Sequence, residues 1–303
     1  MSHISRKNKL LLLKFLSLFS VVRGYNILII VIAQYLASVF ILSPDLPLRA
    51  VIFDLNLFLI VLATALVIAG GYIINSFYDS EKDLINRPQK TKLDHLVSQK
   101  KILTLYFVLN FLAVVVASYV SFFAVLFFSG YIFGIWFYSH KLKKIAFIGN
   151  LTSASLALTP FFAVFIYYRN FETVIFVHAT FLGLIIMMRE LTKDLENLKG
   201  DLALGYHTIP IAYGERSAKA MITLLVGLTV IPTYLLIKTF DVGLMNYYFY
   251  GSLALLLVYL FWLWNSRVKL HYLLLHNILK LILVLGVFSI LLIKPDLVID
   301  KIF

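Results

Sequence analysis

Residues 53–88 read FDLNLFLIVLATALVIAGGYIINSFYDSEKDLINRP, a long apolar run that ends in a cluster of acidic residues. The apolar part covers residues 53–78, and an α-helix needs about 20 apolar residues to cross a bilayer. The run becomes polar near its end, so we expect the last turns of this helix to leave the hydrocarbon. The stretch therefore predicts a membrane-spanning helix that places carboxylates at the membrane surface.

The composition of the whole chain extends this prediction beyond one helix. Of its 303 residues, 61% are hydrophobic and 14% are charged, whereas soluble domains carry about 25% charged residues. Packing within a globular core cannot hide this much apolar surface, so lipid must cover part of it. The chain has no cysteine, which excludes disulfides, thiolate metal sites and cysteine nucleophiles.

Hydropathy and length predict nine membrane-spanning helices in one all-α bundle. We place the spans at residues 24–42, 53–78, 102–119, 121–139, 146–168, 173–190, 218–237, 245–265 and 272–293. A single membrane-embedded domain, residues 1–303, accounts for all of them.

The N-terminal residues 1–22 start with basic side chains and continue into an apolar run that Lys14 interrupts. A signal peptide starts in the same way, but no cleavage site of small residues follows here. We therefore expect a retained helix that lies on the cytoplasmic leaflet.

Positive charges are distributed unevenly between the two sides of the predicted bundle. With the N-terminus in the cytoplasm, the inner segments carry 21 Lys and Arg residues, as five, six, three, five and two along the chain. The outer segments carry five, and Lys280 lies within the ninth span. This bias follows the positive-inside rule and predicts a multi-pass cell-membrane protein with a cytoplasmic N-terminus. Because the charges lie between apolar spans, the net charge of +12 does not indicate nucleic acid as a partner.

The first acidic cluster, NSFYDSEKDLINRP, places Asn75, Asp79 and Asp83 four residues apart. On a helix of 3.6 residues per turn these side chains share one face, one above the other. Carboxylates stacked in this way repel each other unless a cation lies among them, and Mg²⁺ commonly bridges carboxylates to substrate phosphates. The spacing therefore predicts a site for a divalent cation.

The second acidic cluster, RELTKDLENLKGD, repeats this arrangement. Glu190, Asp194, Asn197 and Asp201 follow one another at spacings of four, three and four, and we expect Gly200 to interrupt the helix. Acidic residues at helix ends are often only solvated, and basic loops can pair with them. The C-terminal end of a helix disfavours carboxylates and favours cations. Two clusters, each on one face of a helix and both on the same side of the membrane, therefore indicate a bound cation.

Basic residues on the same membrane face complete this candidate site. The segment YSHKLKK carries Lys141 and Lys143 close to Tyr138, and Arg23 stands at the start of the first span. Lysine and arginine at these positions can bind phosphate oxygens. The alternative is that they only anchor the helix ends at the cytoplasmic surface.

The pattern NxxxDxxxDxxNRP, from Asn75 to Pro88, resembles the first signature of the UbiA-type intramembrane prenyltransferase superfamily. The run from Glu190 to Asp201 is similar to the second signature, and FYSHKLKKIAFIGN and HTIPIAYG are similar to two further family segments. The resemblance implies nine helices around a central cavity with a lateral opening toward lipid. It also implies a cytoplasmic cap formed by residues 79–101 and 190–216.

This resemblance assigns roles to individual residues. It implies that Mg²⁺ is held between the two motifs and binds an isoprenyl diphosphate, such as geranylgeranyl diphosphate. The isoprenyl group is then transferred to a lipophilic acceptor, and membrane lipid surrounds the protein. The implied metal ligands are Asn75, Asp79, Asp83, Asp194 and Asp201. From the residues and the resemblance together we predict Asp79, Asp83, Asp194 and Glu190 as catalytic residues, with Glu190 either a metal ligand or the base that takes the acceptor proton. The predicted substrate contacts are Arg23, Asn75, Arg87, Tyr138, Lys141, Lys143, Lys193 and Asn197.

Within the superfamily, the runs KDLENLKGD and KLKK look most like enzymes of the digeranylgeranylglyceryl phosphate synthase type, whose acceptor is a prenylglycerol phosphate. The chain departs from its relatives at Asn197, where aspartate is frequent, and at QKTKLDH after the first motif. Transfer to an aromatic acceptor, such as 4-hydroxybenzoate or a chlorin precursor, is the alternative enzyme activity. Intramembrane carboxylates also suit an ion-coupled transporter, although the charges gather at one surface and not at the midplane.

Overall fold

The computed structural model describes Asn8, Leu13 and residues 17–94 and 97–293. Within these residues, nine helices are long and apolar enough to cross a membrane. They are α2 (Gly24–Ala37) with its continuation η1 (Ser38–Leu42), α4 (Leu55–Tyr78), α7 (Gln99–Val120), α8 (Phe122–His140), α9 (Ile148–Tyr168), α10 (Thr173–Glu196), α13 (Glu215–Lys238), α14 (Asn246–Asn265) and α15 (Lys269–Ser289). The predicted all-α membrane bundle is confirmed, whereas the single domain over residues 1–303 stays a prediction.

Several helices extend past the predicted spans at the charged end of the bundle. Helix α10 continues from residue 190 to Glu196, and α13 and α15 begin three residues before their predicted starts, at Glu215 and Lys269. Hydropathy reports only the part of a helix that lies in hydrocarbon, so polar turns that project beyond it were missed. The predicted surface helix at residues 1–22 falls mostly outside the described residues.

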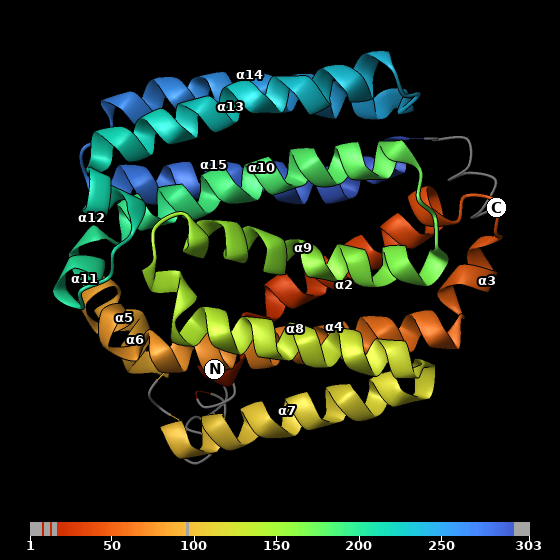
Figure 1. The fold of residues 1–303 in the computed structure, drawn as a ribbon, viewed down its shortest axis with the longest axis horizontal. Helices are drawn as coiled ribbons and strands as arrows, with labels where there is room; N and C mark the ends of the chain where they lie inside the picture. The colour runs from red at the N-terminus through yellow and green to blue at the C-terminus, as the bar shows by residue number, and fades with distance from the viewer. Residues whose placement is uncertain (1–7, 9–12, 14–16, 95–96, 294–303) are drawn as a thin grey trace.

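The helices pack around two apolar clusters. One consists mainly of residues from α10, α13, α14 and α15, with Phe249 and Tyr259 fully buried. The other consists of residues from α2, α4, α7, α8, α9 and neighbouring turns, around the buried Phe128. In Figure 1, α13 and α14 form one side of the bundle and α7 the opposite side.

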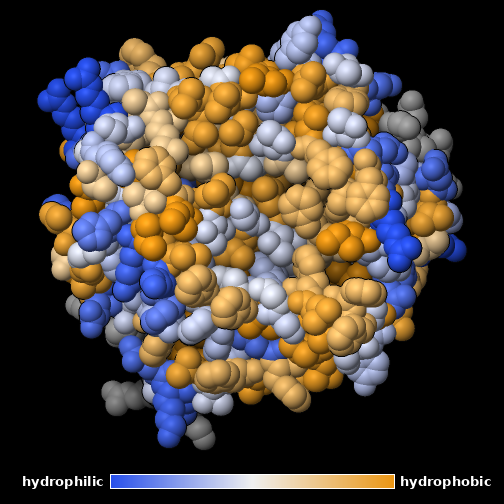
Figure 2. Space-filling view, viewed as in Figure 1, coloured by the Kyte–Doolittle hydropathy of each residue, from blue (hydrophilic) through white to orange (hydrophobic). Residues whose placement is uncertain are grey.

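Many large apolar side chains face outward. Phe111, Phe123 and Phe261 are each more than two-thirds exposed, as expected for residues that lipid covers. Figure 2 shows apolar side chains over much of the middle of one face, with hydrophilic residues gathered toward its ends. The distribution fits an integral multi-pass membrane protein.

Four short helices form a cap at one end of the bundle: α5 (Ser80–Asn86), α6 (Pro88–Asp94), α11 (Leu198–Ala203) and α12 (Ile209–Tyr213). They lie together at the left of Figure 1, where α4 and α10 end. The two acidic motifs therefore meet at the same end of the bundle, which is the arrangement that a shared cation requires.

A glycine sets how closely the two halves of the cap approach each other. The backbone N–H of Gly200 in α11 donates to Asn86 Oδ1 at 3.2 Å, and Asn86 Nδ2 donates to the carbonyl of Asn197 at 3.4 Å. A Cβ at position 200 would collide with the Asn86 side chain and lie 2.9 Å from Lys82 Cγ. Any larger residue must therefore displace the Asn86 and Lys82 side chains of α5.

We expect Gly200→Ala to destabilise the folded protein by about 1–3 kcal/mol, the usual cost of forcing extra volume into a packed contact. Thermal unfolding in detergent measures this effect. The control is Gly227→Ala in α13, where a Cβ meets no atom within 4 Å and alanine improves the helix propensity. Equal unfolding midpoints for the two variants would show that the α5–α11 contact is not tight.

Candidate active site

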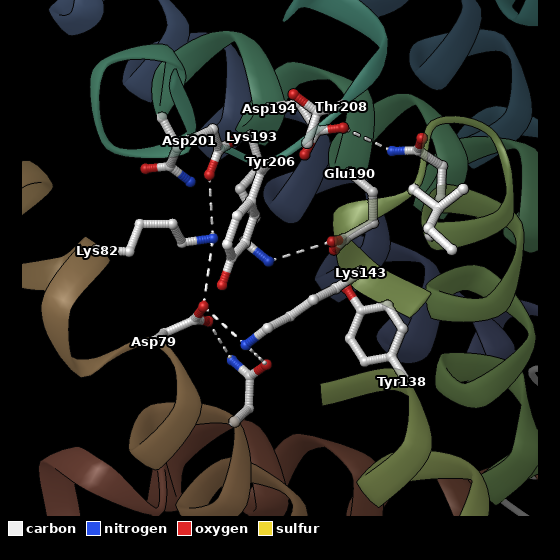
Figure 3. Close-up of a pocket in the computed structure, with 15 residues that line it drawn as sticks. Asp79, Lys82, Tyr138, Lys143, Glu190, Lys193, Asp194, Asp201, Tyr206 and Thr208 are labelled. Carbon is white, nitrogen blue, oxygen red and sulfur yellow. Dashed lines mark hydrogen bonds and ion pairs between the residues drawn. The ribbon is translucent and has the colours of Figure 1, made fainter. Parts of the chain in front are cut away.

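A small polar pocket lies where the cap meets the ends of α4 and α10. It encloses about 30 Å³, because lysine side chains lie against the carboxylates that line it. Figure 3 shows the residues converging from α4, α5, α10, α11 and the turns around them. The lining residues are Asn75, Asp79, Lys82, Tyr138, Lys143, Ile145, Gly149, Asn150, Glu190, Lys193, Asp194, Asn197, Asp201, Tyr206 and Thr208.

The first motif enters the pocket through Asn75 and Asp79. Asn75 Nδ2 donates to Asp79 Oδ2 at 3.0 Å, as expected for neighbours four residues apart on a helix. Helix α4 ends at Tyr78, and Asp79 joins it to α5 with φ −91° and ψ 1°. Because the chain bends there, Asp83 is only half-buried and does not line the pocket.

The second motif enters the pocket through Glu190, Asp194, Asn197 and Asp201, all of which line it. Asp194 Oδ2 accepts a hydrogen bond of 2.7 Å from Asn150 Nδ2. The helix is interrupted at Asn197, and Gly200 lies within α11, so the expected interruption at Gly200 was wrong. The break turns α11 toward α5 and keeps Asp201 in the pocket.

Three lysines form ion pairs with Asp79, Asp201 and Glu190 of the pocket. Lys82 Nζ lies 3.3 Å from Asp79 Oδ1 and 3.2 Å from Asp201 Oδ1, so it bridges the two motifs. Lys143 Nζ lies 2.7 Å from the same Asp79 oxygen, and Lys193 Nζ lies 3.2 Å from Glu190 Oε2. Figure 3 shows these side chains crossing the space between the acidic residues.

A glycine and a backbone contact hold Lys143 in position. Lys143 belongs to the short turn η2 (Leu142–Lys144) between α8 and α9. A Cβ at Gly149 would lie 3.0 Å from the Leu142 carbonyl oxygen and 3.2 Å from Lys143 Cα, so this close approach favours glycine. The N–H of His207 donates to the Lys144 carbonyl at 2.9 Å, which ties the turn to the segment after α11.

The charges shift the pKa values of the pocket residues that lie beyond the membrane-spanning segments. Burial alone raises the pKa of Asp79, but the ammonium groups of Lys143 and Lys82 lower it to about 2. Burial lowers the pKa of Lys82, but Asp79 and Asp201 raise it well above its ordinary value. Asp79 is therefore ionised and Lys82 protonated at neutral pH.

The donor set of the pocket fits a hard divalent cation. Three aspartates and Asn75 offer the oxygen ligands that Mg²⁺ prefers. Within the part of the chain that the structure describes, no three acidic or histidine side chains converge closely enough to hold a metal ion by themselves. The Lys82 ammonium lies between Asp79 and Asp201 instead, where a shared cation is expected.

A larger apolar cavity adjoins the polar pocket. It has a volume of about 420 Å³, is partly open to the outside of the bundle, and is lined by residues of α2, α4, α8, α9, α10, α14 and α15. Four residues line both spaces, namely Asn75, Tyr138, Glu190 and Lys193. A long hydrocarbon chain in the apolar cavity can thus place a polar end in the pocket.

Other predicted site residues lie elsewhere. Arg23 lines the apolar cavity and not the polar pocket. Arg87 does not line either space, and its guanidinium binds Glu196 Oε1 at 2.7 Å across the cap. Lys141 is exposed to solvent, whereas its neighbour Lys143 is buried in the pocket.

Six residues that line the pocket were not predicted from the sequence: Ile145 and Gly149, and the polar residues Lys82, Asn150, Tyr206 and Thr208. Lys82 lies between the two aspartates of the first motif, and Asn150 is the last residue of the family-like segment that carries Lys143. Their positions in these motifs could have identified both residues. Tyr206 and Thr208 flank His207, where the family-like segment HTIPIAYG begins. No charge or spacing marks these two residues as pocket lining.

A protein-family model described as the UbiA prenyltransferase family matches residues 36–272. The chain belongs to the UbiA prenyltransferase family. As a member of this family it is a prenyltransferase, and the sequence-based alternative of an ion-coupled transporter is set aside.

Curated relatives of the chain include two archaeal proteins named digeranylgeranylglyceryl phosphate synthase. The chain is 27% identical over 250 residues to a digeranylgeranylglyceryl phosphate synthase of Methanobrevibacter smithii. The alignment covers 78% of this chain and 83% of the relative. It is 30% identical over 246 residues to the synthase of Thermococcus kodakarensis. This alignment covers 80% of this chain and 83% of the relative.

Solved structures share the UbiA fold. A structure described as a digeranylgeranylglyceryl phosphate synthase in membranes aligns with a TM-score of 0.70 at 21% identity, covering 93% of this chain and 99% of the other. A UbiA homologue of Archaeoglobus fulgidus, bound to GPP and Mg²⁺, aligns with a TM-score of 0.67 at 15% identity, covering 90% and 99%. At these identities the likeness shows the fold alone.

We expect Lys82→Met to tighten the binding of a divalent cation about tenfold, because removing one positive charge near Asp79 and Asp201 lowers the repulsion of a second cation. Titration with Mn²⁺, followed by electron paramagnetic resonance in detergent, measures the dissociation constant. Lys141→Met, at an exposed position outside the pocket, is the control. An unchanged constant for Lys82→Met would mean that the cation binds elsewhere.

Proposed function

We propose that this prenyltransferase transfers an isoprenyl group from an isoprenyl diphosphate to the hydroxyl of a prenylglycerol phosphate, in a reaction that depends on Mg²⁺. The observation that carries the proposal is the junction of the two spaces. A pocket of carboxylates and lysines opens into a cavity of apolar side chains, with Asn75, Tyr138, Glu190 and Lys193 lining both. This arrangement matches a substrate with a diphosphate at one end and a hydrocarbon chain at the other.

The comparisons support the choice of substrates. The named relatives are digeranylgeranylglyceryl phosphate synthases, and they align over about four-fifths of the chain. Fold neighbours from Archaeoglobus fulgidus bind GPP or DMAPP with Mg²⁺. A geranylgeranyl donor is consistent with both the relatives and the size of the apolar cavity.

The diphosphate is proposed to bind among the lysines of the pocket. Mg²⁺, held by Asp79, Asp194 and Asp201 with Asn75, would neutralise charge on the leaving diphosphate. Lys143 and Lys193 contact carboxylates now, and their ammonium groups can turn to diphosphate oxygens. Lys82 must release one of its two aspartates when a divalent cation binds between them.

The transfer breaks one C–O bond and forms another. The bond between C1 of the isoprenyl group and the diphosphate breaks, and the diphosphate leaves with the electron pair. The acceptor hydroxyl oxygen forms a new bond to C1 and loses its proton. The apolar walls of the cavity exclude water, which would otherwise capture the allylic cation.

We assign proton acceptance to Glu190. Among the described residues that line the apolar cavity, it is the one carboxylate, and it lines the polar pocket as well. An acceptor that enters from the apolar side therefore meets Glu190 at the junction. Asp79, Asp194 and Asp201 lie on the polar side and suit the cation.

We also propose that the cap end faces the cytoplasm. The inner segments carry 21 Lys and Arg residues against five outside, and the positive-inside rule assigns the richer side to the cytoplasm.

We expect Asp79→Asn to lower prenyl transfer at least about 100-fold, because one carboxylate that holds the cation against the leaving group is lost. Purified protein, geranylgeranyl diphosphate, Mg²⁺ and geranylgeranylglyceryl phosphate are incubated, and mass spectrometry identifies the ether product. Parallel reactions contain 4-hydroxybenzoate or a chlorophyllide as the acceptor. A product from the aromatic acceptor alone would contradict the proposed acceptor and support the alternative enzyme activity.

The matched control for this variant is Glu81→Gln. Glu81 lies in α5, two residues from Asp79, and is exposed and outside the pocket. It should retain wild-type transfer and the same unfolding midpoint. Wild-type transfer by Asp79→Asn, or full activity without any divalent cation, would overturn the mechanism.

A further inference from the structure

Three basic side chains line the apolar cavity away from the polar pocket: Arg23, Arg189 and Lys280. They come from α2, α10 and α15, and α15 packs against both of the others. Glu190 is the one acidic residue among the described residues that line the same cavity, and Lys193 already binds it. The cavity therefore has an excess of positive charge that no part of the proposed transfer uses.

Lys280 is the least expected of the three. It lies eleven residues after Lys269, where α15 begins, which is about 16 Å along the helix axis. An ammonium group at that depth is costly and usually functional. Within the described chain it has no ion-pair partner, and its Nζ lies 4.2 Å from the centre of the Tyr25 ring.

Arg23, which lines the cavity, has a strained backbone conformation. It caps α2 with φ 49° and ψ 53°, a left-handed conformation that residues other than glycine rarely adopt. Its guanidinium lies 5.1 Å from the centre of the Tyr72 ring. Such strain tends to persist where it positions a functional group.

Arg189 has unused hydrogen-bonding capacity. Its Nε is buried without a hydrogen-bond partner among the described residues. Its nearest acidic contact is Glu190 Oε1, 3.6 Å from the terminal nitrogen, which is too long for a direct hydrogen bond. A guanidinium with free donors is suited to a phosphate, which it can bind through two parallel hydrogen bonds.

We infer that Arg23, Arg189 and Lys280 form a second anion site, which binds the phosphate head group of the acceptor lipid. The inference rests on the proposed function, in which the acceptor is a prenylglycerol phosphate. A phosphate monoester carries up to two negative charges, which match the excess positive charge of the cavity. Its prenyl chain matches the apolar walls.

The position of the site also fits the proposed transfer. Arg189 directly precedes Glu190, the residue assigned to accept the proton at the junction of the two spaces. The glycerol backbone separates the phosphate of the acceptor from its hydroxyl by only a few bonds. A phosphate bound at Arg189 thus keeps the hydroxyl close to Glu190.

The test compares steady-state kinetics of Lys280→Met and the wild type with two acceptors, geranylgeranylglyceryl phosphate and the same lipid without its phosphate. We expect Lys280→Met to raise the KM for the phosphorylated acceptor at least tenfold. Its KM for geranylgeranyl diphosphate should change less than twofold, and Lys280→Arg should restore the acceptor KM. Lys100→Met, at an exposed position of α7 outside both spaces, is the control.

An acceptor KM for Lys280→Met equal to that of the wild type, in a protein that still makes the ether product, would overturn the inference and leave the proposed function intact. Direct titration with the two lipids covers the opposite case. If the wild type makes no product but binds the phosphorylated lipid at least tenfold more tightly, and Lys280→Met removes the difference, the anion site stands and the proposed function fails.

Bilayer phospholipids carry the same phosphate chemistry and need a separate arm. Phosphatidylglycerol is added to the detergent micelles of the wild type and of Lys280→Met. If the wild type still binds the phosphorylated acceptor at least tenfold more tightly than the lipid without its phosphate, the result supports an acceptor site. Loss of that discrimination, with phosphatidylglycerol bound through Lys280, would assign the site to a membrane lipid and overturn the inference.

Discussion

Two acidic helix ends can face each other across one pocket only when positive charge lies between them. In this chain Lys82 supplies that charge, with its ammonium 3.3 Å from Asp79 and 3.2 Å from Asp201. Lys143 binds Asp79 from another side at 2.7 Å. A buried carboxylate deprived of such a partner is strongly destabilising, by about 3–5 kcal/mol. The meeting of the two motifs, and with it the candidate active site, depends on these ion pairs.

The end of the first motif holds the cap in place and does not line the pocket. Asn86 hydrogen-bonds to the backbone of Asn197 and Gly200, and its own carbonyl accepts a hydrogen bond from Lys269 at the start of α15. Arg87 binds the buried carboxylate of Glu196. The motif therefore combines pocket residues with residues that fasten α5 to α10 and α11. This division explains why Arg87 does not contact the pocket as its place in the motif had indicated.

The polar pocket and the apolar cavity occupy different parts of the bundle. Carboxylates and lysines gather beneath the cap, and the walls of the neighbouring cavity are mostly apolar. The separation leaves a small number of residues at the junction, where a charged leaving group and an apolar chain can belong to one molecule. Arg23, Arg189 and Lys280 line the apolar cavity away from the polar pocket, and in the anion site that we infer they would favour an acceptor with a charged head group over a purely apolar one.

The sequence by itself determined the nine spans, the end of the bundle that carries the charges, and the adjacency of Asn75 and Asp79. Hydropathy and the helical repeat are local properties, and the thickness of a bilayer fixes how long each apolar run must be. Only the tertiary structure decided that Lys143 and not Lys141 enters the pocket, that Asp83 stays outside it, and that Lys82 bridges the motifs. Those outcomes depend on how helices far apart in the chain pack and on where α4 and α10 bend, at Asp79 and Asn197. A one-dimensional pattern contains neither the distance between two helices nor the angle at such a bend.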